Sequence, residues 1–226
     1  YPALLEAARA ADTAGAHQIT IHLREDRRHI QDADVKLLRQ KLKVAMNFEM
    51  AVAEEIVRIA IRTKPAWTCL VPEKRQEVTT EGGLNLVRAG KRIGQVTERL
   101  KKAGIQVSHF IEPDPKAVSM AKGLGADAVE LHTGRYCALA QAGRAVKGEV
   151  SRIRLAALEG WRLGVAVHAG HGFDYENVRP IALLLKEDAV TPLISEYNIG
   201  HAVVCRAAIV GMERAVREML SSIHAP

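Results

Sequence analysis

Seven of the eight residues from His22 to His29 carry ionisable side chains, and they follow directly on the apolar run Ile19-Thr20-Ile21. The segment reads His-Leu-Arg-Glu-Asp-Arg-Arg-His. Imidazole and carboxylate groups exchange protons near neutral pH, and guanidinium groups bind phosphate and carboxylate. The segment therefore indicates acid/base chemistry on an anionic, phosphorylated substrate.

Three strand-like segments share one pattern, in which one face turns polar toward the C-terminal end. Successive side chains of a strand point to opposite faces, so alternate residues share a face. A single His or Glu at a strand end is more often a solvated loop residue than a catalytic group, but the same gradient in three strands favours a site. The polar faces consist of Thr20, His22 and Arg24, then Ala45, Asn47 and Glu49, then Ala128, Glu130 and His132.

Two glycine-containing segments follow the last two predicted strands. They are Ala169-Gly-His-Gly172 and Asn198-Ile-Gly-His201. Glycine at a helix start lets backbone N–H groups approach an anion, and the corresponding loops of an α/β barrel often bind phosphate. The alternative is an ordinary tight turn between strand and helix. We assign no role to the other histidines, although His132 and His168 are expected near the pocket mouth.

A long charged loop, residues 72–83, follows the third predicted strand. It supplies Lys74 and Arg75 as cations and Thr79 or Thr80 as hydroxyl donors. The loop is long enough to act as a lid or a phosphate clamp, and a solvated surface loop is an equal alternative.

The elements that must position these residues alternate regularly along the chain. A first helix is predicted over residues 2–14 and ends at Gly15. Strands and helices then alternate, which predicts right-handed βαβ units and a parallel sheet. The predicted strands are 17–23, 43–49, 66–71, 105–111, 127–132, 163–168 and 194–199, and the predicted helices are 32–42, 50–63, 84–103, 114–124, 136–160, 174–186 and 202–223.

Seven strands preceded by a helix favour a (β/α)8 TIM barrel whose first strand lies upstream of Tyr1, since a barrel of this kind closes with eight. The expected organisation is a single domain over residues 1–226, lacking that strand. The alternative is an open doubly wound sheet, but such a sheet normally carries a glycine-rich phosphate loop after its first strand. Here that turn is Arg24-Glu-Asp-Arg-Arg28.

Composition agrees with this class of fold. Of the 226 residues, 48% are hydrophobic but only 4% are aromatic, so small aliphatic side chains must form the core. That favours helices packed on a parallel sheet. Cys69, Cys137 and Cys205 lack the spacing of a disulfide framework or a zinc site. We expect reduced thiols, with Cys69 and Cys205 buried.

Charge and hydropathy indicate the type of partner. The net charge of +6 is dispersed among acidic residues without aromatic interleaving, so phosphorylated small molecules are favoured over nucleic acid. No apolar run reaches the ~18 residues of a membrane span, and no signal peptide opens the chain. We expect a cytoplasmic protein without a membrane partner, and apolar helix faces near 136–160 or 202–223 could form the interfaces of a homo-oligomer.

Six motifs, in order along nearly the whole chain, resemble the pyridoxine 5'-phosphate synthase family. The block Val71-Pro-Glu-Lys-Arg-Gln-Glu-Val-Thr-Thr-Glu-Gly-Gly83 is the most specific of them. The others are His22-Leu-Arg-Glu-Asp-Arg-Arg-His-Ile30, Asn47-Phe-Glu-Met50, Glu130-Leu-His-Thr-Gly134, Ala169-Gly-His-Gly172 and Asn198-Ile-Gly-His-Ala202.

This resemblance implies a TIM barrel that condenses 1-deoxy-D-xylulose 5-phosphate with 3-amino-2-oxopropyl phosphate, giving pyridoxine 5'-phosphate, inorganic phosphate and water. It implies no metal and no organic cofactor, and an upstream first strand that helps to bind both substrates. The family's acid/base groups fall on His22, Glu49 and His171, with Glu130 as transition-state stabiliser. Its sugar-phosphate contacts fall on Arg24, His29 and Thr79, and its aminoketone-phosphate contacts on Gly172, Gly200 and His201.

Two rival hypotheses remain open at this point. One is a barrel aldolase or epimerase for a sugar phosphate, with a metal held by His22, Glu49 and His171; metal analysis distinguishes it. The other, which ranks far lower, is a basic nucleic-acid-binding protein, whose binding would weaken steeply with salt.

Overall fold

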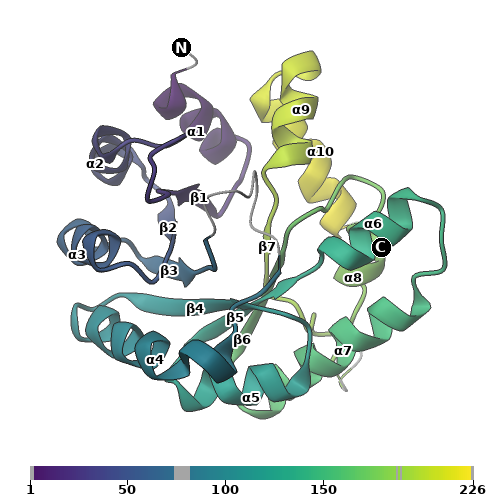
Figure 1. The fold of residues 1–226 in the computed structure, drawn as a ribbon. Coiled ribbons are helices and arrows are strands. Elements are labelled where there is room, and N and C mark those ends of the chain that lie inside the picture. Colours follow the sequence, from purple (N-terminus) through teal and green to yellow (C-terminus); the bar gives the residue numbers. More distant parts are fainter. Residues whose placement is uncertain (1–2, 74–81, 187, 189, 225–226) are drawn as a thin grey trace.

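A computed structural model describes residues 3–73, 82–186, 188 and 190–224. Its centre is a sheet of seven parallel strands that pair in sequence order, and they curve around a common axis with helices on the outside (Figure 1). The fold is a TIM-type α/β barrel, as predicted. The strands are β1 (Gln18–His22), β2 (Ala45–Met50), β3 (Trp67–Leu70), β4 (Gln106–Ile111), β5 (Ala128–His132), β6 (Ala166–Gly170) and β7 (Glu196–Asn198).

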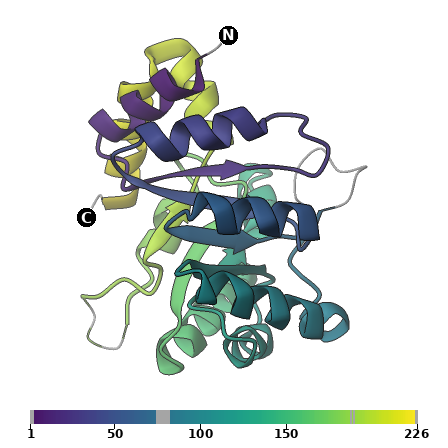
Figure 2. The same ribbon diagram turned by 90° about the vertical axis from the view of Figure 1, so that its left-hand side faces the viewer.

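Helices cover the outer face of the sheet, and Figure 2 shows them layered along its side. Helix α1 precedes the first strand and packs against α10 near the two termini. The helices are α1 (Leu4–Thr13), α2 (Asp32–Lys41), α3 (Glu54–Thr63), α4 (Leu86–Lys102), α5 (Pro115–Gly123), α6 (Gly134–Gln141), α7 (Lys147–Arg162), α8 (Arg179–Ala182), α9 (His201–Val210) and α10 (Met212–His224).

The two faces of the sheet differ in polarity. Outward side chains such as Phe48, Ile111 and Leu131 are buried beneath the helices and form the main core. Inward side chains are largely polar, and two of them join the edge strands: Thr20 Oγ1 of β1 donates to Asn198 Oδ1 of β7 at 2.7 Å. The barrel is therefore nearly closed, with an apolar core outside the sheet and polar groups inside it.

Four glycines between helices and strands adopt the backbone that only glycine takes readily. Each has a positive φ, between 65° and 103°. The turn from helix to strand is therefore fixed by local sequence at Gly15, Gly104, Gly125 and Gly164.

Several predicted boundaries were wrong. The single helix expected over 136–160 is two helices, because the chain turns at Gly143 with φ 62°. The helix expected over 202–223 breaks at Gly211, whose φ of 84° is not helical. The strand expected over 163–168 begins at Ala166, after the Gly164 turn, and runs on to Gly170.

The segment expected as a helix over 174–186 contains only the short helix α8. Asp174 and Asn177 form a hydrogen-bonded turn before it, and a bridge between Leu185 and Pro192 ends the helical region. The predicted burial of one thiol was also wrong. Cys205 is exposed on α9, whereas Cys137 is buried, as Cys69 is. None of the described helices is long and apolar enough to cross a membrane.

Candidate active site

Parallel strands bring their C-terminal ends to one end of the barrel, which we call the barrel mouth. His22 is the last residue of β1 and pairs in register with Glu49 of β2. Their side chains approach each other, with His22 Nδ1 3.7 Å from Glu49 Oε2. Glu130 points inward from the middle of β5, and His171 follows the last residue of β6. These four residues, His22, Glu49, Glu130 and His171, are the candidate cluster.

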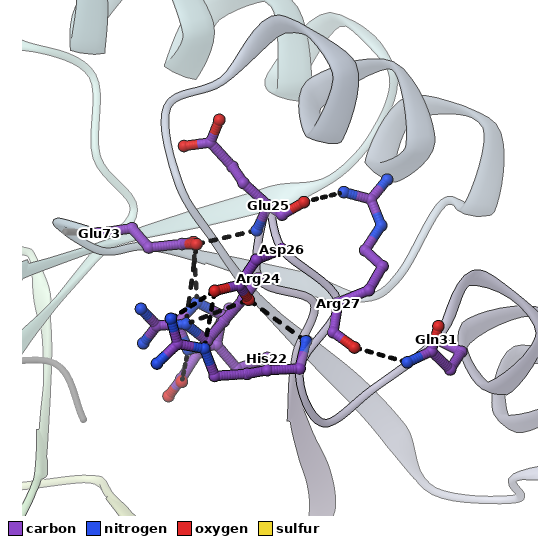
Figure 3. A network of polar contacts seen from close by, with 9 residues as sticks. His22, Arg24, Glu25, Asp26, Arg27, Gln31 and Glu73 are labelled. Atoms are coloured by element: carbon purple, nitrogen blue, oxygen red, sulfur yellow. Dashed lines mark hydrogen bonds and ion pairs between the residues drawn. The ribbon is translucent and has the colours of Figure 1, made fainter. Parts of the chain in front are cut away.

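His22 lies between two carboxylates. Glu49 faces Nδ1, and Glu73, from the segment after β3, lies 3.5 Å from Nε2. Figure 3 shows Glu73 reaching His22 and Arg24 from the opposite loop. Burial, then the charges of Arg24 and His29, lower the pKa of His22 to about 4. Its imidazole is therefore neutral at pH 7 and able to accept a proton.

Glu49 has the opposite shift. Burial at the barrel mouth raises the pKa of its carboxyl group to about 7. The side chain still keeps 23% of its surface exposed, so a substrate can reach it. A carboxylate that titrates near neutral pH is suited to general base catalysis.

Glu130 is the most deeply placed member of the candidate cluster. It is 2% exposed, and Oε2 accepts a hydrogen bond of 2.8 Å from Asn198 Nδ2. Burial, then the neighbouring carboxylates of Glu49 and Glu196, raise the pKa of Glu130 well above its ordinary value. A raised pKa favours the protonated form of a carboxyl group, and that form can donate a hydrogen bond to a developing negative charge.

His171 has an unusual backbone conformation. Its φ of 77° lies in the left-handed region, which costs a residue with a Cβ about 1 kcal/mol or more. Thr133 Oγ1 holds the strained turn by donating to the His171 carbonyl oxygen at 2.8 Å. Burial, then His132, lowers the pKa of the imidazole. The left-handed conformation ends β6 at Gly170 and turns the chain at His171.

Two groups of residues at the barrel mouth suit anions. Arg24 is 4% exposed, while His29 lies on the surface of the same loop. At the other edge strand, Gly200 and His201 begin α9 after β7, and the first turn of α9 has no side-chain cap, so its N–H groups are available. Gly172, with φ 89°, follows His171. Thr79, like Lys74, Arg75 and Thr80, lies outside the described residues.

The sequence patterns assigned no role to three residues that contact the candidate cluster or His132 beside it. Glu73 accepts the Glu25 backbone N–H at 2.8 Å and is 3% exposed. Asn198 connects Glu130 to Thr20, and Glu112 accepts a hydrogen bond from His132. Each of the three residues ends a strand or follows one, and this position is the sequence feature that could have identified them.

The part of the chain that the structure describes contains no group of three or more His, Cys, Asp or Glu side chains placed to hold a metal ion. The three residues of the aldolase hypothesis, His22, Glu49 and His171, do not form such a group.

Gly170 leaves room for Glu130, and this gives a first prediction. A Cβ at position 170 would lie 2.1 Å from Glu130 Oε1 and 3.2 Å from the Asn198 carbonyl oxygen. Gly170→Ala should displace the carboxyl group and lower kcat roughly 10- to 100-fold. Gly148→Ala, where nothing lies within 4 Å, is the matched control and should keep kcat. Steady-state kinetics decide, and a wild-type kcat for Gly170→Ala would contradict the placement of Glu130.

Known proteins resemble this chain in sequence and in fold. The model of the family "Pyridoxal phosphate biosynthesis protein PdxJ" matches residues 1–225. A pyridoxine 5'-phosphate synthase of Magnetococcus marinus is 50% identical over 220 residues, covering 97% of this chain and 87% of the relative. A protein of that name from Syntrophotalea carbinolica is 49% identical over 218 residues, covering 96% and 88%.

Solved structures at low identity support the fold alone. A phosphoribosyl anthranilate isomerase from Thermus thermophilus superposes with a TM-score of 0.61 at 16% identity, covering 97% of this chain and 93% of that one. A 4-hydroxy-2-oxoglutarate aldolase superposes with a TM-score of 0.65 at 16% identity, covering 99% and 89%.

Proposed function

The chain belongs to the family of pyridoxal phosphate biosynthesis proteins PdxJ, and on this premise we propose that its barrel mouth makes pyridoxine 5'-phosphate. The substrates are 1-deoxy-D-xylulose 5-phosphate and 3-amino-2-oxopropyl phosphate, and the other products are inorganic phosphate and water. The single observation that carries the proposal is the convergence of two carboxyl groups and two imidazoles, with opposite pKa shifts, at one end of the barrel.

The reaction requires repeated proton transfers. An amine and a ketone condense to an imine with loss of water, and ring closure then needs carbon acids to be deprotonated and hydroxyl or phosphate groups to leave. Several groups with different proton affinities serve this sequence better than one. The candidate cluster supplies a neutral imidazole, a carboxyl group with a pKa of about 7, and a second carboxyl group whose pKa burial raises well above its ordinary value.

We assign the proton-accepting roles to His22 and Glu49. The two side chains are 3.7 Å apart and face the same space. At pH 7 His22 is unprotonated and Glu49 is partly ionised, so both can take protons from substrate carbon or nitrogen.

We assign the proton-donating role to His171 and charge stabilisation to Glu130. Burial, then His132, lowers the pKa of His171, and a phosphate dianion beside Gly172 would raise it again by attraction of opposite charge. Binding of the phosphorylated substrate would therefore favour the protonated imidazole of His171, which is the form that donates a proton. Burial raises the pKa of Glu130, which favours its protonated form as a hydrogen-bond donor to an oxygen that gains negative charge.

The two phosphate groups would occupy the two anion-binding regions. Arg24 and His29, with Thr79, contact the sugar phosphate, while Gly172, Gly200 and His201 contact the aminoketone phosphate. The uncapped first turn of α9 supports the second assignment, because its N–H groups and helix dipole attract a dianion.

An assay with both substrates tests the function. The protein should form pyridoxine 5'-phosphate, seen by its pyridine absorbance, and release inorganic phosphate in the same amount. Omission of either substrate should abolish both signals, and a chelator should leave the rate unchanged. Turnover of one sugar phosphate alone, or dependence on an added divalent metal, would favour the aldolase hypothesis instead.

The exposed face of α9 and the phosphorylated substrates bear on assembly and compartment. We propose a homo-oligomer, because α9 exposes Val204 and Ile209, which are 58% and 80% exposed. Sedimentation of a monomer at micromolar concentration would contradict this. We propose a cytoplasmic location because both substrates are phosphorylated metabolites.

A further inference from the structure

The imidazole of His171 has little to orient it apart from one ring contact. Its backbone is fixed, since Thr133 Oγ1 and Cys137 Sγ both approach the carbonyl oxygen, at 2.8 Å and 3.6 Å. The imidazole itself makes no hydrogen bond within the part of the chain that the structure describes. Its ring contact is with His132, at a centroid distance of 4.8 Å and an interplanar angle of 54°.

His132 is in turn held by a carboxylate. Its Nδ1 lies 3.0 Å from Oε1 of Glu112, the residue that follows β4. The hydrogen bond from His132 is the main cause that lowers the pKa of Glu112, so this carboxylate is ionised at neutral pH. An ionised carboxylate at Nδ1 fixes the proton on that nitrogen and sets the plane of the ring, as in hydrolase triads.

Other groups fix both members of this pair. The ring of Phe110 packs edge-on against His132 at 5.3 Å. Glu112 also accepts the Gly83 backbone N–H at 3.1 Å, and Arg152 lies 4.0 Å away. The pair is therefore anchored by β4, by the segment before α4 and by α7.

The space around the two rings is shaped to hold them together. A Cβ at Gly134 would lie 2.7 Å from His132 Nε2 and 2.8 Å from His171 Cδ2. Only glycine at this position lets both rings lie against the first turn of α6. His132 Nε2 is buried and has no hydrogen-bond partner among the described residues, so the contact with Glu112 uses only one of the two ring nitrogens.

We propose that His132 and Glu112 are positioning residues for the proton donor His171. The order is Glu112, then His132, then His171: the carboxylate fixes the first ring, and that ring fixes the orientation of the second. This inference rests on the proposed function of His171. It assigns the two residues no contact with substrate.

A double-mutant cycle tests the inference. His132→Ala should lower kcat roughly 10- to 100-fold and leave KM for both substrates within about twofold, because a misaligned donor slows chemistry without weakening binding. Glu112→Gln should give a smaller loss in the same direction. Added to His171→Ala, His132→Ala should cause little further loss, because it acts through a residue that is already absent.

His132→Phe separates positioning from simple loss of packing. It keeps a ring against His171 but loses the Glu112 hydrogen bond, so its kcat should lie between those of wild type and His132→Ala. The matched control is His109→Gln, which alters a buried imidazole on β4 that contacts Thr97 outside the barrel and should keep kcat.

A readout that needs no turnover keeps this inference separate from the proposed function. In NMR spectra of the wild-type protein, the His171 ring protons should show cross-relaxation to the His132 ring and a single ring orientation. His132→Ala should give averaged His171 signals. The proposal would be overturned by wild-type kcat in His132→Ala, by an additive loss in the double variant, or by unchanged His171 ring signals in the single variant His132→Ala. Absence of synthase activity in the wild type would overturn the proposed function alone.

Discussion

Glu49→Gln is expected to lose activity and gain stability at the same time. The amide keeps the shape of the side chain but cannot accept a proton, so kcat should fall roughly 10²- to 10⁴-fold. In the wild type, kcat should rise with pH through about 7 as Glu49 ionises, and this limb should be absent from the residual activity of the variant.

The sign of the stability change follows from the raised pKa. The folded protein holds the Glu49 proton up to about pH 7, whereas the unfolded chain releases it near 4.5. The free energy of unfolding therefore falls as pH rises between these values, and above pH 7 the whole penalty is present. Gln does not ionise, so the variant should be about 1–3 kcal/mol more stable than wild type at pH 8 and equal to it at pH 4.

Urea denaturation at the two pH values measures this difference. The matched control is Glu54→Gln on α3, where hydrogen bonds from Arg99 and Arg58 lower the pKa of the carboxyl group to about 2. That variant should not gain stability at pH 8 and should keep kcat. A Glu49→Gln protein that is active, or less stable than wild type at pH 8, would contradict the role of Glu49.

His22→Asn is the second variant with a large expected effect. Asparagine keeps a polar group between Glu49 and Glu73 but has no basic nitrogen, so kcat should fall roughly 10²- to 10³-fold. The pH limb near 7 should remain, because it belongs to Glu49. Steady-state kinetics between pH 5 and 9 measure both effects.

The control for His22 is His109, a histidine whose pKa is also lowered but which lies away from the barrel mouth. Burial also lowers the pKa of His109 to about 4, yet its ring contacts Thr97 beneath α4. His109→Gln should change stability and leave kcat near wild type. Wild-type kcat in His22→Asn would contradict the role of His22 as a proton acceptor. A loss of kcat in His109→Gln as large as that in His22→Asn would show that the effect is not specific to the barrel mouth.

The sequence predicted the parts of the site that depend on strand periodicity. Alternation along β1, β2 and β5 placed His22, Glu49 and Glu130 on inward faces, and parallel pairing then brought them to one end. The barrel itself was predictable for the same reason, because each βαβ unit is specified by local pattern.

The rest depended on contacts between segments far apart in the chain. Glu73 reaches His22 only because the segment after β3 turns back over the β1 loop, and no local pattern encodes that turn. The Glu112 contact with His132 joins neighbouring strands whose relative register is set by the whole sheet. The helix breaks at Gly143 and Gly211 were missed because apolar periodicity continues across both glycines.

A crystal structure with pyridoxine 5'-phosphate and inorganic phosphate bound tests the central claim most directly, which is that the candidate cluster surrounds one reaction site. We expect the pyridine ring at the barrel mouth, within hydrogen-bond distance of Glu49, Glu130 and His171, with one phosphate group at Arg24 and His29 and the other at the start of α9. Binding of the product at any other surface, with His22, Glu49 and His171 remote from the ring, would contradict the account.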